Sequence, residues 1–283
     1  MRLEVPFIVA ALVTGAAAGR PGTPVSTSRL GRHTPALAPP VITITAREYA
    51  FDGPDSIESG PTTIRLVSVG REQHFLGLVR IAGSHTLADY RRVLTSKRTP
   101  PWAIPAGGVG TISPGGAAMT TLDLEPGLYA MVCDMADAHG TPHMLEGMLR
   151  LLTVSPRGNG ASMPTPNVTV ALTEYAFLGP DTLQPGPRVI GVRNAGSQPH
   201  MALVWRLAPG KSVSAVIHWL ETPSDRSHPI ALLGGVPDLA PGQEAQLLLH
   251  LEVGHYLLIC LVEDPQDHTA HYEKGMVKEF TVR

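Results

Sequence analysis

The segment "TAREYAFDGPDSIESGP", residues 45–61, is matched without a gap by "ALTEYAFLGPDTLQPGP", residues 171–187. Both segments contain Glu-Tyr-Ala-Phe, then Gly-Pro-Asp, then Gly-Pro, and they lie 126 residues apart. Self-similarity at a fixed offset is the signature of a repeated structural unit. The sequence therefore predicts two copies of one domain.

The match continues along both copies at offsets of 126 to 128 residues. The matched positions are His74 with His200, Gly107-Gly108-Val109 with Gly234-Gly235-Val236, Cys133 with Cys260, and Gly147-Met148 with Gly275-Met276. A copy of about 115 residues fits the usual size of a domain. We expect the domains at residues 41–155 and 167–283. The Pro/Gly/Ser-rich residues 156–166 between them read as a linker.

Within each copy the apolar residues mostly alternate with polar ones, which predicts strands. Examples are "VITITAREYAF" and "GLYAMVC" in the first copy, and "VTVALTEYAF" and "GHYLLIC" in the second. Each copy also contains one helical pattern, after a capping box of Thr86 and Asp89 in the first and behind Ser212 in the second. The predicted fold is all-β: two tandem Greek-key β-sandwiches, each with one short inserted helix.

The composition and the N-terminal residues limit the classes of function that are expected. The 283 residues are 43% apolar and 16% charged, with a formal net charge of -2. No basic stripe appears, so a nucleic-acid partner is not expected. A short apolar run after Arg2 ends at Ala16-Ala17-Ala18 and reads as a signal peptide of residues 1–18. A Pro-rich linker of residues 19–40 follows. An exported protein, periplasmic or extracellular and without a stable membrane span, is expected.

The chain has two cysteines. In an oxidising compartment two cysteines invite a disulfide. However, Cys133 and Cys260 occupy the same interior position of two separate domains, after "LYAMV" and "HYLLI". A bridge would need the two cores to meet at that point, which the separation of the domains opposes. We therefore expect two free cysteines.

Each cysteine is followed in its loop by a histidine and a methionine, and one more histidine lies upstream. The sets are His74, Cys133, His143 and Met148 in the first copy, and His200, Cys260, His271 and Met276 in the second. A thiolate, two imidazoles and a weak axial thioether form the ligand set that selects copper. Core packing of these side chains is the alternative, and their equivalence in both copies opposes it.

The motifs resemble those of the cupredoxins, the plastocyanin- and azurin-like blue copper proteins. The resemblance rests on Asn194-x-Gly196 before His200, and on Gly-x-Tyr, an apolar strand, Cys, a loop, His and Gly-Met in both copies. It implies one mononuclear type 1 copper per domain, held by the two quartets named above.

Two features depart from that pattern. Nine residues separate Cys133 from His143 and ten separate Cys260 from His271, where the family usually has only a few. The first copy reads Ser68-Val69-Gly70 in place of Asn-x-Gly, so the bracing of its cysteine is expected to differ.

No His-x-His pair, which a three-copper oxygen site needs, occurs in the chain. A copper with all its positions filled by protein leaves no place for substrate, so an electron carrier is expected and not an enzyme. The alternative is a metal-free or copper-storing structural or binding module of the cell envelope.

A redox partner such as a cytochrome is expected for an electron carrier. The late-loop histidines are expected nearest the surface, inside an acidic collar that steers a basic partner. The collar residues are Asp134, Asp137, Glu263, Asp264 and Asp267.

Overall fold

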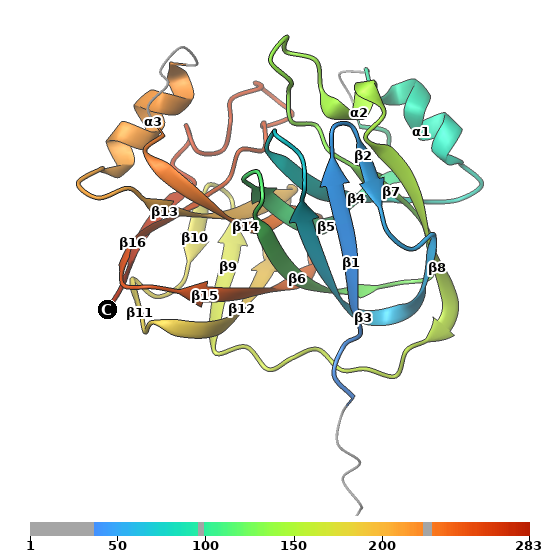
Figure 1. Ribbon diagram of the computed structural model, residues 1–283, viewed down its shortest axis with the longest axis horizontal. Helices are drawn as coiled ribbons and strands as arrows, with labels where there is room; N and C mark the ends of the chain where they lie inside the picture. Colours follow the sequence, from blue (N-terminus) through green and yellow to red (C-terminus); the bar gives the residue numbers. More distant parts are fainter. Residues whose placement is uncertain (1–36, 96–98, 223–227) are drawn as a thin grey trace, which may run out of the picture. The chain divides into compact units, whose positions relative to one another are not determined.

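Strands dominate the computed structural model, which describes residues 37–95, 99–222 and 228–283 (Figure 1). The predicted signal peptide, and the predicted linker up to residue 36, lie outside the described residues. Among the described residues no helix is long and apolar enough to cross a membrane.

The first half comprises β1 to β8 with two helices. Its elements are β1 (Val41–Arg47), β2 (Ala50–Asp52), β3 (Ser56–Ser68), β4 (His74–Ile81), α1 (Leu87–Val93), β5 (Ala103–Ile112), β6 (Ala117–Leu124), β7 (Gly127–Val132), α2 (His143–Glu146) and β8 (Leu149–Gly158). One sheet has the order β2–β1–β3–β6, with β1 parallel to β3. The other has the order β3–β8–β7–β4–β5. Strand β3 contributes its first residues to one sheet and its later residues to the other, which joins the sandwich along one edge.

The second half comprises β9 to β17 with one helix. Its elements are β9 (Val168–Thr173), β10 (Ala176–Leu178), β11 (Thr182–Leu183), β12 (Gly186–Asn194), β13 (His200–Leu207), α3 (Val213–Glu221), β14 (Ile230–Leu239), β15 (Glu244–Leu251), β16 (Gly254–Ile259) and β17 (Val277–Val282). Its sheets, β10–β9–β12–β15 and β11–β17–β16–β13–β14, repeat those of the first half. The predicted all-β fold of two tandem sandwiches is confirmed.

The predicted helices are present at both places, outside the sheets (Figure 1). The capping box of α1 is complete: Asp89 N–H donates to Thr86 Oγ1 at 3.2 Å, and Thr86 N–H donates to Asp89 Oδ2 at 2.9 Å. Ser212 caps α3 by accepting from Ala215 N–H at 3.3 Å. The additional helix α2 is one turn long and begins at His143, where only a loop was expected.

The boundary between the halves lies after β8, which continues to Gly158. Asn159 is tied back to the first half, since its side-chain amide donates to Pro61 O at 2.9 Å. The next segment contacts the second half, where Gln246 donates to Pro164 O. The domain limits given above remain predictions, with these contacts as guides to where each half begins and ends.

The two halves join through equivalent strands. Strand β6 pairs antiparallel with β15, and Thr120 lies opposite Leu247, its own equivalent at an offset of 127 residues. Strand β5 packs beside β14, with Ala106 paired to Leu239. Thr120 Oγ1 also donates to Gly235 O across this contact at 3.1 Å. The repeat therefore buries the same strands of both copies against each other.

Two glycines of β5 and β14 lie where these strands pack together, Gly110 and Gly234. A Cβ atom on Gly110 would lie 2.7 Å from the carbonyl carbon of Gly234 and 2.8 Å from the nitrogen of Gly235. A Cβ atom on Gly234 would lie 2.5 Å from the Cβ of Ala118. Only glycine allows the two backbones to approach so closely.

We expect Gly110→Ala to lower the free energy of unfolding by about 1–3 kcal/mol, because the new methyl group meets backbone that cannot rotate away. Urea denaturation measures the effect. Gly158→Ala is the control, since a Cβ there has nothing within 4 Å. Equal urea midpoints for Gly110→Ala and Gly158→Ala would show that β5 and β14 can move apart without loss of stability.

Candidate metal centres

Each predicted ligand of the first half lies at the end of a strand. His74 is the first residue of β4, and Cys133 directly follows β7. His143 begins α2, and Met148 directly precedes β8. Since β4 and β7 are neighbours in one sheet, their ends bring His74 and Cys133 together.

The second half repeats this placement. His200 begins β13, Cys260 directly follows β16, and Met276 directly precedes β17. His271 lies in the turn before Met276. Strands β13 and β16 are again neighbours in their sheet.

The structure brings two His-Cys-His groups together. We call His74, Cys133 and His143 site 1, and His200, Cys260 and His271 site 2. In each site the three ligand atoms lie within 4.8 Å of one another, and all six residues are buried. Cys133 Sγ lies 3.6 Å from His143 Nδ1, and Cys260 Sγ lies 3.5 Å from His271 Nδ1. In site 2 the two Nδ1 atoms are 3.1 Å apart.

Both methionines are fully buried beside these groups. Met148 accepts a hydrogen bond from Cys133 N–H at 3.3 Å and donates to His143 O at 2.9 Å. Met276 makes the same bonds with Cys260 and His271, at 3.2 Å and 2.9 Å. The main chain thus holds each methionine next to its site. Axial ligation by the thioethers remains a prediction.

The long loops return each late histidine to its cysteine. His143 N–H donates to Met135 O at 2.8 Å, and His271 N–H donates to Val262 O at 2.8 Å. Both acceptors lie two residues after the cysteine of their site. The extra residues form an outward turn, which in the first half is closed by Asp137 accepting from Thr141 N–H at 2.7 Å. The greater loop length therefore does not separate the donor atoms.

The late-loop histidines, which were expected nearest the surface, are buried. His143 and His271 are both 0% exposed. Tyr49 covers His143 with 4.8 Å between ring centroids, and Tyr175 covers His271 at 5.2 Å. These tyrosines belong to the repeated Glu-Tyr-Ala-Phe segment, whose role the sequence alone did not reveal.

The predicted acidic collar of exposed carboxylates is wrong for the second half. Asp264 is buried, accepts from the hydroxyl of Tyr175, and pairs with Lys274 Nζ at 2.7 Å. Lys274 also pairs with Asp267 at 2.8 Å, so one ammonium group is shared by the two carboxylates. The hydrogen bonds from Lys274 and Tyr175 hold the pKa of Asp264 well below its usual range. Glu263 remains exposed.

The side chain of Asn194 holds the loop that precedes His200, whereas the sequence predicted that it would hold the cysteine. Its amide donates to Gln198 O and Leu239 O, both at 2.8 Å, and its oxygen accepts from Gly196 N–H at 2.9 Å. The equivalent Ser68 of the first half has a buried hydroxyl without a hydrogen-bond partner among the described residues. The two loops before the first histidine are therefore held differently.

Burial favours the uncharged forms of both thiols and of three of the imidazoles, His74, His200 and His271. Burial raises the pKa of both thiols, Cys133 and Cys260, to about 12. Burial, and next the neighbouring His271, lower the pKa of His200 to about 4. Burial first of all also lowers the pKa of His74 and of His271.

Several imidazole nitrogens have no hydrogen-bond partner among the described residues. They are both nitrogens of His74 and the Nε2 atoms of His200 and His271. Glu48 Oε1 lies 3.5 Å from His74 Nε2, which is too long for a good hydrogen bond. Buried polar atoms without partners are costly. In site 2 the nitrogens that converge are the Nδ1 atoms of His200 and His271, and together with the thiol they form a donor set that fits copper.

A carboxylate lies over the first histidine of each site. Glu48 accepts from Glu72 N–H at 2.8 Å and also from Arg71 N–H, and Glu174 accepts from Ser197 N–H. A Cβ on Gly196 would lie 2.7 Å from both Glu174 Oε1 and His200 Nε2. The glycine of the Asn-x-Gly motif therefore leaves room for the carboxylate above the imidazole.

A cavity of about 360 Å³ lies between the halves beside both sites. Its lining includes the residues that directly follow five of the predicted ligands, namely Phe75, Asp134, Met144, Met201 and Leu261. Asp238 of β14 lines it as well, with Oδ1 buried and unpartnered among the described residues. Burial, and then the charge of Asp134, raise the pKa of Asp238 to about 6.

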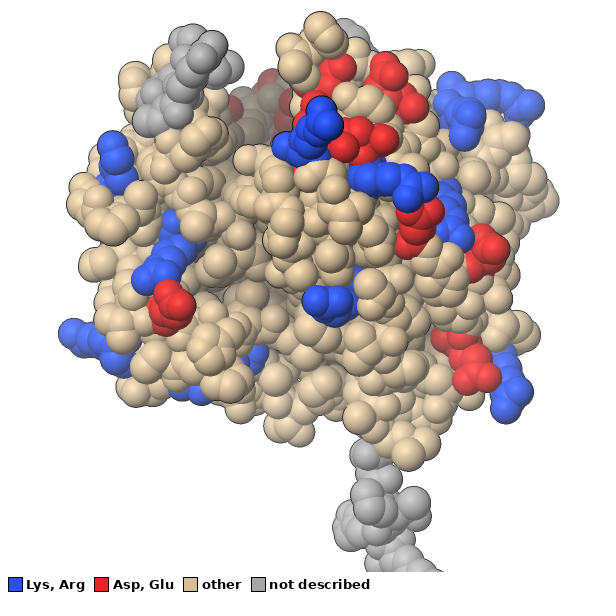
Figure 2. All heavy atoms as spheres, viewed as in Figure 1, with Lys and Arg blue, Asp and Glu red and all other residues tan. Residues whose placement is uncertain are grey.

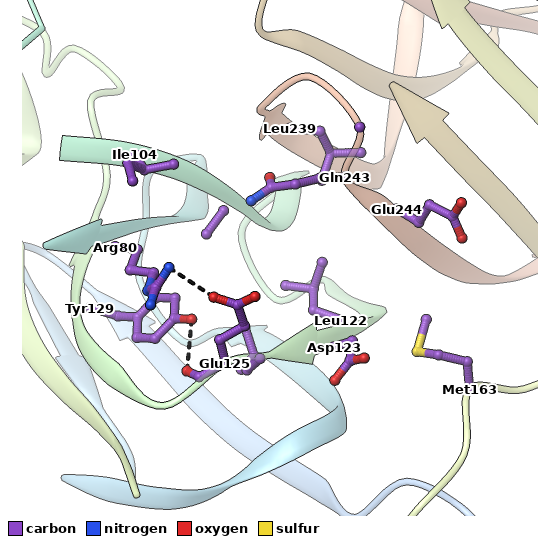
Figure 3. A pocket seen from close by; sticks show the side chains of 13 residues that line it. Arg80, Ile104, Leu122, Asp123, Glu125, Tyr129, Met163, Leu239, Gln243 and Glu244 are labelled. Carbon is purple, nitrogen blue, oxygen red and sulfur yellow. Dashed lines mark hydrogen bonds and ion pairs between the residues drawn. The ribbon is translucent and has the colours of Figure 1, made fainter. Parts of the chain in front are cut away.

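A second, larger groove of about 490 Å³ is separate from the sites (Figure 3). Arg80, which lines it, is paired with Glu125 at 2.8 Å, and Tyr129 donates to Glu125 O at 2.9 Å. Because these polar groups are satisfied by one another, the groove presents no donor set comparable with sites 1 and 2.

No protein-family model and no curated protein matches the sequence. Among solved structures, the chain is similar to a dithionite-reduced auracyanin of Roseiflexus castenholzii, with 21% identity, a TM-score of 0.32, and coverage of 42% of this chain and 100% of that one. It is similar to auracyanin A, titled a blue copper protein, of Chloroflexus aurantiacus, with 20% identity, a TM-score of 0.30, and coverage of 42% and 100%. A copper-containing nitrite reductase of Thermus scotoductus SA-01 has 15% identity, a TM-score of 0.27, and coverage of 87% of this chain and 62% of that one.

We expect Asp238→Asn to raise the free energy of unfolding at pH 8. The pKa of Asp238 is raised to about 6 in the folded protein, so stability is lost as the pH rises from the ordinary range of a carboxyl to about 6, and the loss is complete above that pH. The gain should be about 1–2 kcal/mol at pH 8, less than the full shift because the cavity admits solvent, and close to zero at pH 4. Urea denaturation at both pH values measures it, with the exposed Asp123→Asn as control. A gain that is equal at both pH values would contradict the assignment.

Proposed function

We propose that this protein is a copper-binding cupredoxin that transfers electrons, with one mononuclear copper site in each half. The observation that carries the proposal is the pair of buried His-Cys-His groups at equivalent strand ends. Exported location and a redox protein partner, for example a cytochrome, belong to the same proposal.

The proposed ligands are His74, Cys133, His143 and Met148 in site 1, and His200, Cys260, His271 and Met276 in site 2. Copper bound to this donor set would supply a one-electron couple between Cu(I) and Cu(II). The protein residues hold the donors in place by strand pairing and by the backbone bonds around each methionine. Such rigidity favours a carrier, because little rearrangement accompanies a change of oxidation state.

Burial supports a carrier over a catalyst. All six donor residues are 0% exposed, and a tyrosine covers the late histidine of each site. A copper with all four positions taken by protein and no access for solvent has no place for a substrate. Electrons, in contrast, can pass through a few ångströms of packed side chains.

The cysteines support ligation over a structural role. Both are free and fully buried in separate sandwiches. Each lies next to an imidazole nitrogen, and in site 2 the sulfur also accepts from Met201 N–H at 3.4 Å. A thiol placed this way needs only to lose its proton to bind a metal, and metal binding drives that loss.

We expect Cys133→Ser or His143→Ala to remove about half of the bound copper and half of the absorption of the Cu(II)-thiolate. The two sites lie in different halves, so the remaining site should stay intact. Metal analysis and visible spectra of Cu(II)-loaded protein measure both quantities. His139→Ala, an exposed histidine of the same loop, is the matched control and should retain full copper.

The double variant Cys133→Ser/Cys260→Ser should bind no copper at the sites and show no colour. Copper content that is unchanged in this variant would refute the proposed function. It would favour a structural module of the envelope in its place.

A further inference from the structure

The two sites have the same donors but different coverings, and the difference is a matter of charge. In site 1, His143 Nε2 lies 2.7 Å from Glu72 Oε2. The equivalent of Glu72 is Gln198, since each lies two residues before the first histidine of its site. In site 2, His271 Nε2 has no hydrogen-bond partner among the described residues. One late histidine is therefore joined to a carboxylate, and the other is not.

Gln198 is directed elsewhere. Its amide nitrogen lies 3.4 Å from the hydroxyl of Tyr175, and its Oε1 has no partner among the described residues. Glutamine at this position can give neither negative charge nor, in this arrangement, a hydrogen bond to His271. The replacement thus removes the carboxylate–imidazole pair that site 1 has.

The residue before Gly-Met also carries a more negative charge in the first half than in the second. It is Glu146 in the first half and Lys274 in the second. Lys274 Nζ lies 5.0 Å from the centre of the Tyr175 ring and pairs with both Asp264 and Asp267. A cation therefore lies on the tyrosine that covers site 2.

Around site 1 the charges are negative. After burial, the carboxylates that raise the pKa of Tyr49 are Glu72, Asp137, Glu146 and Glu48. Acidic side chains gather over the ends of β1, β2 and α2 in Figure 2, with some basic ones beside them. Tyr49 covers His143, so this negative field acts directly on site 1.

A metal site that loses an electron gains one positive charge. A carboxylate bonded to the outer nitrogen of a ligand imidazole stabilises that charge and makes the imidazole a stronger donor. A nearby ammonium group opposes it. The surroundings of site 1, where Glu72 contacts His143, therefore favour the oxidised ion more than those of site 2, where Asp264 and Asp267 are paired with Lys274.

We propose that the difference between Glu72 and Gln198 gives the two sites unequal reduction potentials, so that Cu(II) is favoured more at site 1 than at site 2. This inference rests on the proposed function. Glu72 is a positioning residue that acts through His143. The protein then holds two copper sites of unequal reduction potential, and a single electron resides on site 2.

The test uses full-length single-site proteins, each loaded with copper. Cys260→Ser retains site 1, and Cys133→Ser retains site 2. Redox titration followed by visible absorption should give a midpoint for site 1 that is lower than that of site 2 by at least a tenfold change in the equilibrium constant, which is 59 mV for one electron.

Exchange of the two residues separates charge from structure. In the site 1 protein, Glu72→Gln should raise the midpoint. In the site 2 protein, Gln198→Glu should lower it. Glu58→Gln and Gln184→Glu make the same chemical changes on exposed residues away from the sites, and should leave both midpoints unchanged. Opposite shifts from the two exchanges cannot arise from a general loss of packing.

Equal midpoints for the two single-site proteins would overturn the inference, and so would an exchange at either position without effect. Absence of copper from both single-site proteins would instead refute the proposed function. If Glu72→Gln fails to fold, which circular dichroism shows, the Gln198→Glu result decides the question.

Discussion

Burial of uncharged donors against an apolar core is the constraint on which the rest of this structure depends. Two imidazoles and a thiol lie within 4.8 Å of one another in each half, all without exposure to solvent. Such a group is costly unless its polar atoms have partners. Sheet pairing holds these donors together, because β4 pairs with β7 in the first half and β13 pairs with β16 in the second.

The loops follow from the same constraint. A loop of nine or ten residues between cysteine and histidine has many conformations, but hydrogen bonds at 2.8 Å return each histidine to the backbone two residues after the cysteine. The remaining loop residues can then vary. One copy uses an aspartate that accepts from the loop backbone, and the other uses a buried carboxylate, a tyrosine and a lysine. The two copies have the same donor residues and differ in the charged residues that surround them.

The contact between the halves shows a second constraint. Where β5 and β14 pack together, a side chain on Gly110 or Gly234 would overlap with the facing strand. These two glycines thus allow the two copies to join. The same junction places a cavity between the sites, lined by residues that directly follow their ligands.

The sequence by itself determined the duplication, the all-β class, the helix caps at Thr86 and Ser212, and the eight candidate ligands. These are properties of local periodicity and of equivalent positions, both of which one chain displays when it contains two copies. Tertiary structure alone decided that Asp264 is buried and paired, that both late histidines are covered, and that Glu72 reaches His143 across 71 residues of sequence. A charged side chain can lie in solvent or contact an imidazole, depending on which distant strands lie together at one end of a sandwich. A local sequence pattern does not contain that information.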